Sequence, residues 1–186
     1  MGRALWRFQF PMTKESRKKV WRVRDRKGNI AYFKFRLQKP WFKRDKSMIA
    51  NEFIAISLAR KLGLPVARLS RAIIKGRSKR PVKGYISRQV NANEVITWKK
   101  ACDDVKANPQ RYINDTHLLA RTIVFDVWIL NKDRTDVNLI LYRDYPWEKY
   151  SWYLIDFGSS LLGSRSNSTY KRIKKRRHPQ LRKPLR

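Results

Sequence analysis

The chain has 186 residues, enough for one domain of ordinary size or for two small lobes that share a cleft. Of these residues 42% are hydrophobic and 12% aromatic, so the chain can bury a core and is no disordered polybasic linker. Lys and Arg number 45, and Asp and Glu number 14, which gives a formal net charge of +31. Proteins this basic usually lie against a polyanion, most often nucleic acid.

The sequence also excludes several classes of protein. One cysteine, Cys102, and two histidines, His117 and His178, rule out an internal disulfide framework and a zinc site built from Cys or His. No apolar run approaches the roughly 18 residues of a membrane span, and the first residues lack the apolar stretch of a secretory signal. We therefore expect a soluble, cytoplasmic protein with no membrane span.

The charges are unevenly distributed along the chain. From Phe53 to Asn93 there are ten basic residues and no acidic one, whereas ten of the 14 acids lie between Glu94 and Asp156. After Gly163 come ten Lys or Arg residues and no acid. We expect a basic N-terminal arm over residues 1–18, a first lobe over 19–90, a second lobe over 91–162 and a basic tail over 163–186.

The first half predicts a hairpin. The runs Val20–Asp25 and Ile30–Arg36 are rich in β-branched and aromatic residues and flank a short loop that contains Gly and Asn. Alternation along the second strand places Ala31 and Phe33 on one face and Lys34 on the other.

A helix and a second hairpin are predicted next. Ser47 is a suitable N-cap for a helix, and Gly63 and Pro65 are typical of a helix end. The segments Val66–Ile74 and Gly84–Val90 then predict two strands around a basic turn.

The second half begins with an apolar helix. Asn114 or Asp115 is a suitable cap for a helix over roughly Thr116–Leu130, whose composition indicates burial on most sides. A polar loop follows, and then Leu139–Tyr142 and Trp152–Ile155 predict a hairpin.

Phosphoryl transfer from ATP requires a lysine for the phosphates, a glutamate to orient it, an aspartate for the proton of the nucleophile, and oxygen ligands for magnesium. The sequence has this set in the required order. Lys34 lies on a predicted strand and Glu52 on the next helix, Asp133 and Asn138 share one loop, and Asp156 directly follows a strand.

These segments resemble the HipA-like kinases. The loop Asn131-Lys-Asp-Arg-Thr-Asp-Val-Asn138 is similar to the Asn-x-Asp-Arg-x-x-x-Asn loop of that family, and Tyr153-Leu-Ile-Asp156-Phe-Gly resembles its metal-binding segment. Glu52-Phe-Ile-Ala and Leu62-Gly-Leu-Pro65 are similar to its helix and helix exit. The resemblance covers roughly residues 19–162. It implies an α+β, bilobal protein-kinase-like fold, with a small antiparallel-sheet N-lobe that carries one helix and a truncated helical C-lobe.

The resemblance also implies a function, phosphorylation of serine or threonine on a protein with ATP and magnesium as cofactors, and a role for each matched residue. Lys34 would bind phosphate, Glu52 would pair with Lys34, and Asp133 would be the catalytic base. Asn138 and Asp156 would hold magnesium, and Ser87, Gln89 and Val90 would lie in the segment that binds adenine.

Two further acids are expected to have structural roles. Asp136 lies in the polar loop and is predicted to be a solvated turn residue. Asp126 lies in the apolar helix and is predicted to be a buried partner for Arg134.

The positive charge predicts a nucleic-acid partner. Residues 1–162 alone hold 35 basic and 14 acidic residues, and aromatic side chains, which can stack on unpaired bases, interleave with the basic ones. We expect phosphate-led, weakly sequence-specific binding to RNA or DNA. The candidate residues in the tail are Lys171, Arg172, Lys174, Lys175, Arg176 and Arg177.

Two functions therefore stay open. One is an active kinase whose protein substrate carries or is bound to nucleic acid, which the matched catalytic set favours. The other is a catalytically inactive kinase-like subunit held on RNA or DNA. Members of the family continue with several helices after the metal-binding Asp, whereas 30 residues follow Asp156 here, so we expect a partner chain to cover the short C-lobe. Phosphorylation of a small molecule or a lipid head group would use the same residues, and a polybasic tail also suits an anionic membrane surface.

Overall fold

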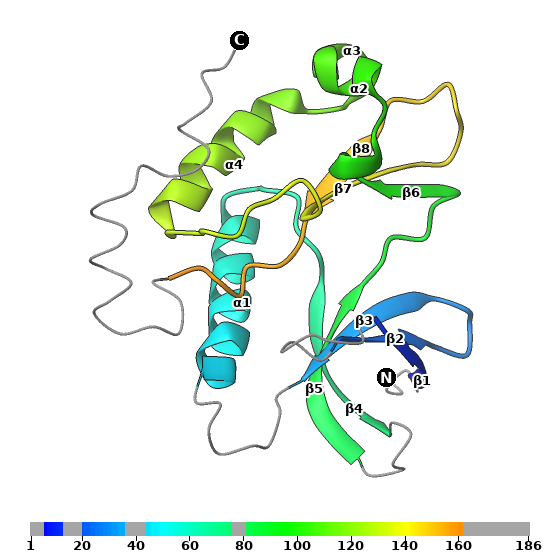
Figure 1. Cartoon of the computed structure of the whole chain (residues 1–186), viewed down its shortest axis with the longest axis vertical. Helices are drawn as coiled ribbons and strands as arrows, with labels where there is room; N and C mark the ends of the chain where they lie inside the picture. Colours follow the sequence, from blue (N-terminus) through cyan, green and yellow to red (C-terminus); the bar gives the residue numbers. More distant parts are fainter. Residues whose placement is uncertain (1–5, 13–19, 36–43, 76–80, 162–186) are drawn as a thin grey trace. The chain divides into compact units, whose positions relative to one another are not determined.

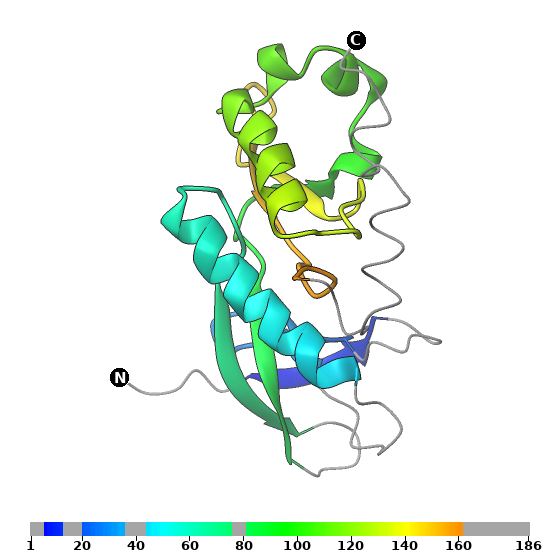
Figure 2. The ribbon, with the colours of Figure 1, turned by 90° about the vertical axis from the view of Figure 1, so that its left-hand side faces the viewer.

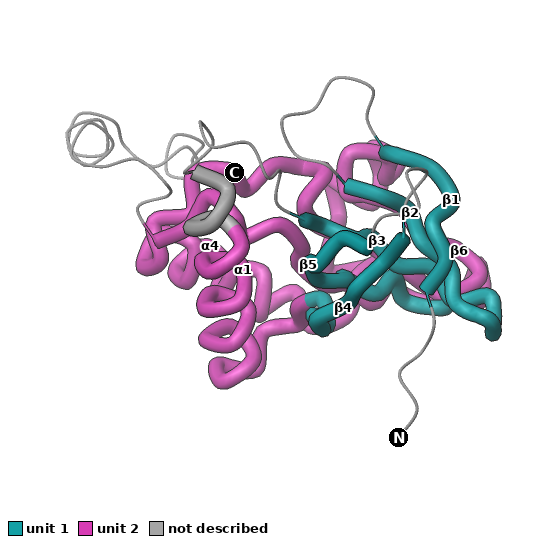
Figure 3. Tube along the Cα trace, turned by 90° about the horizontal axis from the view of Figure 1, so that it is seen from below, with its two compact units in different colours: residues 1–42, 67–91 teal, residues 43–66, 92–186 magenta. Residues whose placement is uncertain are grey.

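The structure is a computed structural model that describes residues 6–12, 20–35, 44–75 and 81–161 (Figure 1). Packing divides the chain into two compact units, one of residues 1–42 and 67–91 and the other of residues 43–66 and 92–186 (Figure 3). Each unit contains one antiparallel sheet. The architecture is mixed α+β, as the sequence predicts.

The first unit is a five-stranded sheet in the order β1-β2-β3-β5-β4. Its strands are β1 (Arg7–Pro11), β2 (Val20–Arg24), β3 (Ile30–Phe35), β4 (Leu69–Lys75) and β5 (Pro81–Arg88). The hairpin predicted from the first half of the sequence is β2–β3, in which Val23 pairs with Ala31.

The core of this unit lies on the face that the alternation in β3 predicts. Ala31 and Phe33 are fully buried, and they form one cluster with residues of the neighbouring strands. At Gly84 on β5 an added Cβ would lie 2.4 Å from the carbonyl oxygen of Lys34 and 2.8 Å from the Phe33 ring. β3 and β5 therefore approach too closely here for any side chain.

β1 lies within residues 1–18, for which the sequence predicted a basic arm and no strand. Residues 7–11 pair with β2 as an edge strand, and Trp6 is buried in the core of the unit. The register shifts between Phe8 and Phe10, and Pro11 ends the strand. The shift breaks the alternation by which a strand is recognised in a sequence, and Pro is a residue that edge strands tolerate.

Helix α1 (Arg44–Lys61) begins three residues before Ser47, so the predicted cap is wrong. No residue type in positions 44–46 interrupts a helix, and the helix extends to them. The predicted end is confirmed. Gly63 has a φ of 71°, and the N–H of Leu64 donates to the carbonyl of Ala59 over 2.9 Å, which is the Schellman arrangement.

The next two predicted strands are confirmed with shifted ends. β4 begins at Leu69 and β5 begins at Pro81, and they pair from Leu69 with Ser87 to Lys75 with Pro81. Pro81 stands at the first position of its strand, where a missing N–H is tolerated. The basic turn over residues 76–80 lies outside the described residues.

The second unit contains α1, a three-stranded sheet in the order β6-β7-β8 and the remaining helices (Figure 2). The strands are β6 (Glu94–Thr97), β7 (Leu139–Arg143) and β8 (Ser151–Leu154), and the helices are η1 (Trp98–Lys100), α2 (Asp103–Ala107), α3 (Pro109–Tyr112) and α4 (Thr116–Trp128). The hairpin predicted from Leu139–Tyr142 and Trp152–Ile155 is β7–β8. The sequence did not predict β6, η1, α2 and α3, because elements of three to five residues show no readable period.

α4 confirms the predicted apolar helix but is less buried than expected. Phe125 and Asp126 lie on its buried face, whereas Val124 and Trp128 are 70% and 64% exposed. Asp115 occupies the N-cap position, but its side chain makes no capping hydrogen bond.

The helices of the described residues include none with the length and apolarity that a membrane span requires. The lobe limits predicted at residues 18, 90 and 162 stay predictions. By its packing, α1 belongs to the second unit.

Candidate functional site

The polar loop after α4 and the segment after β8 meet at one end of the β7–β8 hairpin. Leu139 pairs with Leu154, and one step beyond this pair the N–H of Ile155 donates to the carbonyl of Asn138 over 3.1 Å. Asn138 precedes β7 directly, and Asp156 follows Ile155. Strand pairing therefore brings Asn138 and Asp156 to the same end of the hairpin.

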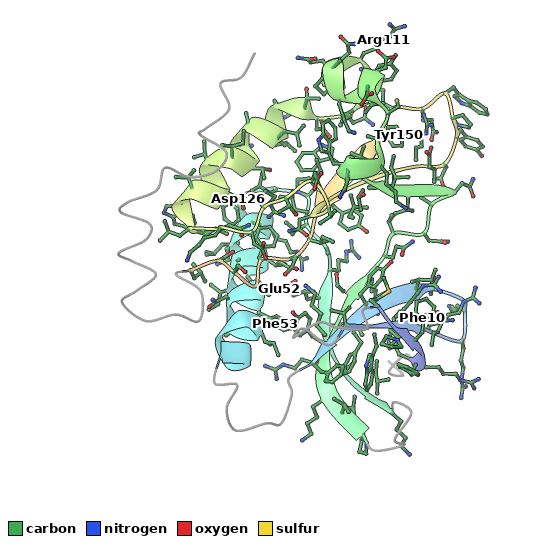
Figure 4. All side chains as sticks on the ribbon, in the orientation of Figure 1. Phe10, Glu52, Phe53, Arg111, Asp126 and Tyr150 are labelled. Atoms are coloured by element: carbon green, nitrogen blue, oxygen red, sulfur yellow. The ribbon has the colours of Figure 1, made fainter. Side chains whose placement is uncertain are left out.

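Arg134 joins the loop to α4 and to the end of β8. Its Nε donates to Oδ2 of Asp126 over 2.8 Å, and this ion pair is buried, with 7% and 0% of the two side chains exposed. Its Nη1 donates to the carbonyls of Asn138, over 3.2 Å, and of Ile155, over 2.8 Å. The guanidinium also lies 4.5 Å from the ring centre of Phe157. The predicted Asp126–Arg134 pair is confirmed, and Figure 4 shows Asp126 on α4.

Two asparagines fix the backbone of Asp133. The buried Asn131 donates from its side chain to Oδ1 of Asp126 over 2.8 Å, and its Oδ1 accepts the N–H of Asp133 over 3.3 Å. The side chain of Asn138 donates to the carbonyl of Asp133 over 2.6 Å. Asp133 is therefore held from both sides by residues of its own loop.

The Asp133 carboxylate is half-buried and accepts a hydrogen bond from Ser159, whose Oγ lies 3.3 Å from Oδ2. The sequence patterns did not identify Ser159 as a residue of the site. The sequence feature that could have pointed to Ser159 is its position directly after Asp156-Phe-Gly158. Asp136, in the same loop as Asp133, is exposed, as predicted.

The backbone is strained at three positions of this region. Leu130, Asp156 and Leu161 have φ angles of 53°, 57° and 55°, in the left-handed region that side chains disfavour. Aspartate tolerates this conformation better than leucine does. Contacts on both sides hold Asp156 there, because Ile155 is paired with the loop and Phe157 is fully buried.

α1 contributes two buried polar residues. Asn51 donates from its side chain to the carbonyl of Ser160 over 2.8 Å, which fixes the segment after β8 to the helix. Glu52, the next residue, is labelled on α1 in Figure 4. Its side chain is buried, with 2% exposed, so it does not form an ion pair on the surface of the helix. A carboxylate at this depth requires a partner that offsets the loss of water.

Lys34 lies in the first unit, half-buried on β3 and paired in register with Tyr85 of β5. Two residues earlier, the hydroxyl of Tyr32 donates to Oε1 of Gln89 over 2.9 Å. Burial raises the pKa of Tyr32 above its ordinary value, and the charge of Arg22 opposes this shift. Tyr32 therefore stays protonated at neutral pH and remains a donor.

The residues predicted to bind adenine lie at the end of β5. Ser87 is buried within the strand, and the N–H of Gln89 donates to the carbonyl of Ile30 over 3.1 Å. Val90 follows and is half-buried. These residues share the first unit with Lys34, whereas Glu52, Asp133, Asn138 and Asp156 belong to the second.

The oxygen donors of the second unit suit magnesium. The described residues contain no cluster of three or more His, Cys, Asp or Glu side chains, as a zinc or calcium site would have. The side-chain amide nitrogen of Asn138 donates to the backbone carbonyl of Asp133, so the side-chain oxygen Oδ1 of Asn138 is directed away from that carbonyl. An amide oxygen and the carboxylate of Asp156 are hard ligands of the kind that magnesium takes beside several waters. The tail residues predicted to bind nucleic acid, 171, 172 and 174–177, lie outside the described residues.

Comparison with known proteins bears on the fold and on the family of the chain. The crystal structure of a Helicobacter pylori proinflammatory kinase, CtkA, is similar to this chain with a TM-score of 0.55 and 16% sequence identity, which confirms the predicted kinase-like fold. The likeness covers 91% of this chain and 64% of CtkA, so the chain spans about two thirds of that kinase. No curated protein matches the chain. A family model described as HipA-like kinase matches residues 34–174, more than half of the chain. The chain therefore belongs to the HipA-like kinase family.

Proposed function

We propose that the chain is an ATP- and magnesium-dependent protein serine/threonine kinase. The observation that supports this most is the set of hydrogen bonds around Arg134, which gathers the segments of Asp133, Asn138 and Asp156 at one end of a hairpin. Catalysis of phosphoryl transfer depends mainly on positioning and on neutralising charge. A rigidly held set of these three residues meets that requirement.

In this proposal the residues of the second unit handle the acceptor and the metal. Asp133 orients the acceptor hydroxyl and takes its proton, and its fixed backbone limits the directions in which the carboxylate can lie. Asn138 and Asp156 hold magnesium, which supplies positive charge against the phosphate oxygens. Glu52 orients the phosphate-binding lysine.

The first unit supplies the nucleotide contacts. Lys34 binds phosphate from β3, and Ser87, Gln89 and Val90 lie along the segment that takes the adenine. The hydroxyl of the neutral Tyr32 donates to Oε1 of Gln89 and so fixes the side chain of this residue of the adenine segment.

The charge of the chain supports a nucleic-acid partner. A net charge of +31 on 186 residues disfavours a compact chain unless counter-charge is supplied. We propose that the protein substrate carries or is bound to RNA or DNA. The same observation favours the second candidate function, a catalytically inactive kinase-like subunit held on nucleic acid.

Labelled ATP separates the two candidates. Wild-type protein, Asp133→Ala and Asp136→Ala are freed of nucleic acid and incubated with γ-labelled ATP and magnesium, before and after nucleic acid is added back. Asp136 is the matched control, because it lies exposed in the same loop. The kinase proposal expects label on the chain or a co-purified partner in the wild type and in Asp136→Ala, and none in Asp133→Ala. No label and no magnesium-dependent nucleotide binding in the wild type would leave the structural subunit as the function.

The nucleic-acid proposal has its own test. Deletion of residues 169–186 should weaken binding to many sequences alike and reduce the dependence of the binding constant on salt, because fewer counterions are released. A salt dependence that the deletion leaves unchanged contradicts a role for the tail.

A further inference from the structure

Ser159 donates a hydrogen bond to the carboxylate that orients the acceptor in the proposed function. Its Oγ lies 3.3 Å from Oδ2 of Asp133, and both residues are half-buried. An acceptor hydroxyl that approaches Asp133 must itself present an O–H group to the carboxylate. Ser159 therefore makes, within the chain, the contact that an acceptor makes.

The backbone on both sides of Ser159 is fixed. Before it, Phe157 is fully buried, and the Arg134 guanidinium lies over its ring. After it, the carbonyl of Ser160 accepts a hydrogen bond from Asn51 of α1. The hydroxyl of Ser159 is thus presented to Asp133 from a held segment.

We propose that Ser159 is a specificity-determining residue of the acceptor site, whose hydroxyl occupies the acceptor's place on Asp133 until an acceptor displaces it. The inference rests on the proposed function, because it requires Asp133 to orient the acceptor. An acceptor that docks well offsets the loss of the Ser159 contact through its other contacts. Water has no such contacts, so Ser159 suppresses the wasteful hydrolysis of ATP.

The test is magnesium-dependent hydrolysis of ATP by the full chain, freed of nucleic acid, with water as the acceptor. In this reaction the water oxygen bonds to the γ-phosphorus, the bond to the β–γ bridging oxygen breaks, Asp133 takes a proton from the water, and ADP leaves with the bridging oxygen. Ser159→Ala removes the competing hydroxyl and should raise the hydrolysis rate about threefold to tenfold. This factor corresponds to the usual net free energy of one hydrogen bond. Ser159→Thr keeps a hydroxyl and should hydrolyse ATP at the wild-type rate.

Ser160→Ala is the matched control. Ser160 is the next residue, is fully buried and makes no side-chain hydrogen bond within the described part of the chain. Its alanine variant should hydrolyse ATP at the wild-type rate. Calorimetry should give the same Kd for magnesium-ATP in all four proteins, since Ser159 acts on the acceptor.

The outcomes separate this inference from the proposed function. If magnesium-ATP binds with unchanged Kd and Ser159→Ala hydrolyses it no faster than the wild type, the inference is wrong and the proposed nucleotide binding stands. A Ser159→Thr variant that behaves like Ser159→Ala also overturns it, because the hydroxyl is then irrelevant. If the wild type shows no magnesium-dependent binding of ATP, both proposals fail.

Discussion

Replacing Arg134 by Met should destabilise the second unit strongly. Methionine has a similar length and no charge, so the change removes the guanidinium and little volume. It leaves the Asp126 carboxylate, which is 0% exposed, without its cation. It also removes the Arg134 donor from the carbonyls of Asn138 and Ile155.

The size of the effect follows from the burial of the pair. Removing one partner of a buried ion pair costs about 3–5 kcal/mol, because the remaining charge is uncompensated. For a chain of 186 residues each kcal/mol lowers Tm by about 2–4 °C, so the shift should be about 6–20 °C. Replacing both charges, in Asp126→Leu with Arg134→Met, should recover part of the loss, because an apolar pair leaves no buried charge.

Urea unfolding followed by tryptophan fluorescence measures these differences. The matched control is Arg143→Met, because Arg143 forms an ion pair with Glu94 in the same unit with 20% and 39% of the two side chains exposed. That pair should contribute about 1 kcal/mol or less. The reasoning is refuted if Arg134→Met costs no more than Arg143→Met, or if the double variant is less stable than Arg134→Met alone.

Three further predictions concern stability and pH. Gly84→Ala should cost about 1–3 kcal/mol in urea unfolding, because its Cβ would meet the Lys34 carbonyl oxygen at 2.4 Å, and a neutral result would show that the sheet yields there. Hydrogen bonds, of which the one from the Asn29 side chain has the largest effect, lower the pKa of Asp25 below its ordinary value of 3.8. The ionised carboxyl therefore stabilises the fold above pH 3.8, and this stabilisation is lost as the pH falls through the lowered pKa. An NMR titration should show a higher Asp25 pKa in Asn29→Ala, and an equal pKa contradicts the assigned cause. Ser160→Ala should leave the free energy of unfolding unchanged or raise it by up to about 1 kcal/mol, because it removes a buried hydroxyl that has no hydrogen-bond partner among the described residues. A clear loss of stability in urea unfolding would show that the hydroxyl does have a partner.

The strands with regular alternation could be predicted from the sequence, and the irregular ones could not. In β3 the period of two is sufficient to assign Ala31 and Phe33 to the buried face. In β1 the register shift at Phe8 to Phe10 removes that period. The N-terminus of α1 was misplaced because Ser47 suits a cap chemically but also fits within a helix, and local preference does not decide between the two positions.

For the candidate site, the sequence could predict which segments carry the polar residues but not which side chains touch one another. The order and spacing of Asp133, Asn138 and Asp156 identified the loop and the segment after β8, and the charge of Arg134 suggested its buried partner. Ser159 was missed because its contact with Asp133 spans 26 residues and depends on how the hairpin closes. Contacts of this kind are set by tertiary packing, which no local pattern in the sequence reports.

The left-handed residues Leu130, Asp156 and Leu161 have a consequence for local stability. A side chain in this conformation costs of order 1–3 kcal/mol, and the surrounding contacts must offset that cost. When these contacts weaken, the two turns, one at Leu130 and one over Asp156–Leu161, relieve strain by opening. Opening these turns therefore costs less free energy than opening the strands β7 and β8. Amide hydrogens of the two turns should therefore exchange with solvent through local opening, at a lower free energy than global unfolding of the unit. The same dihedral angles that place these polar groups therefore lower the free energy of local opening at the two turns.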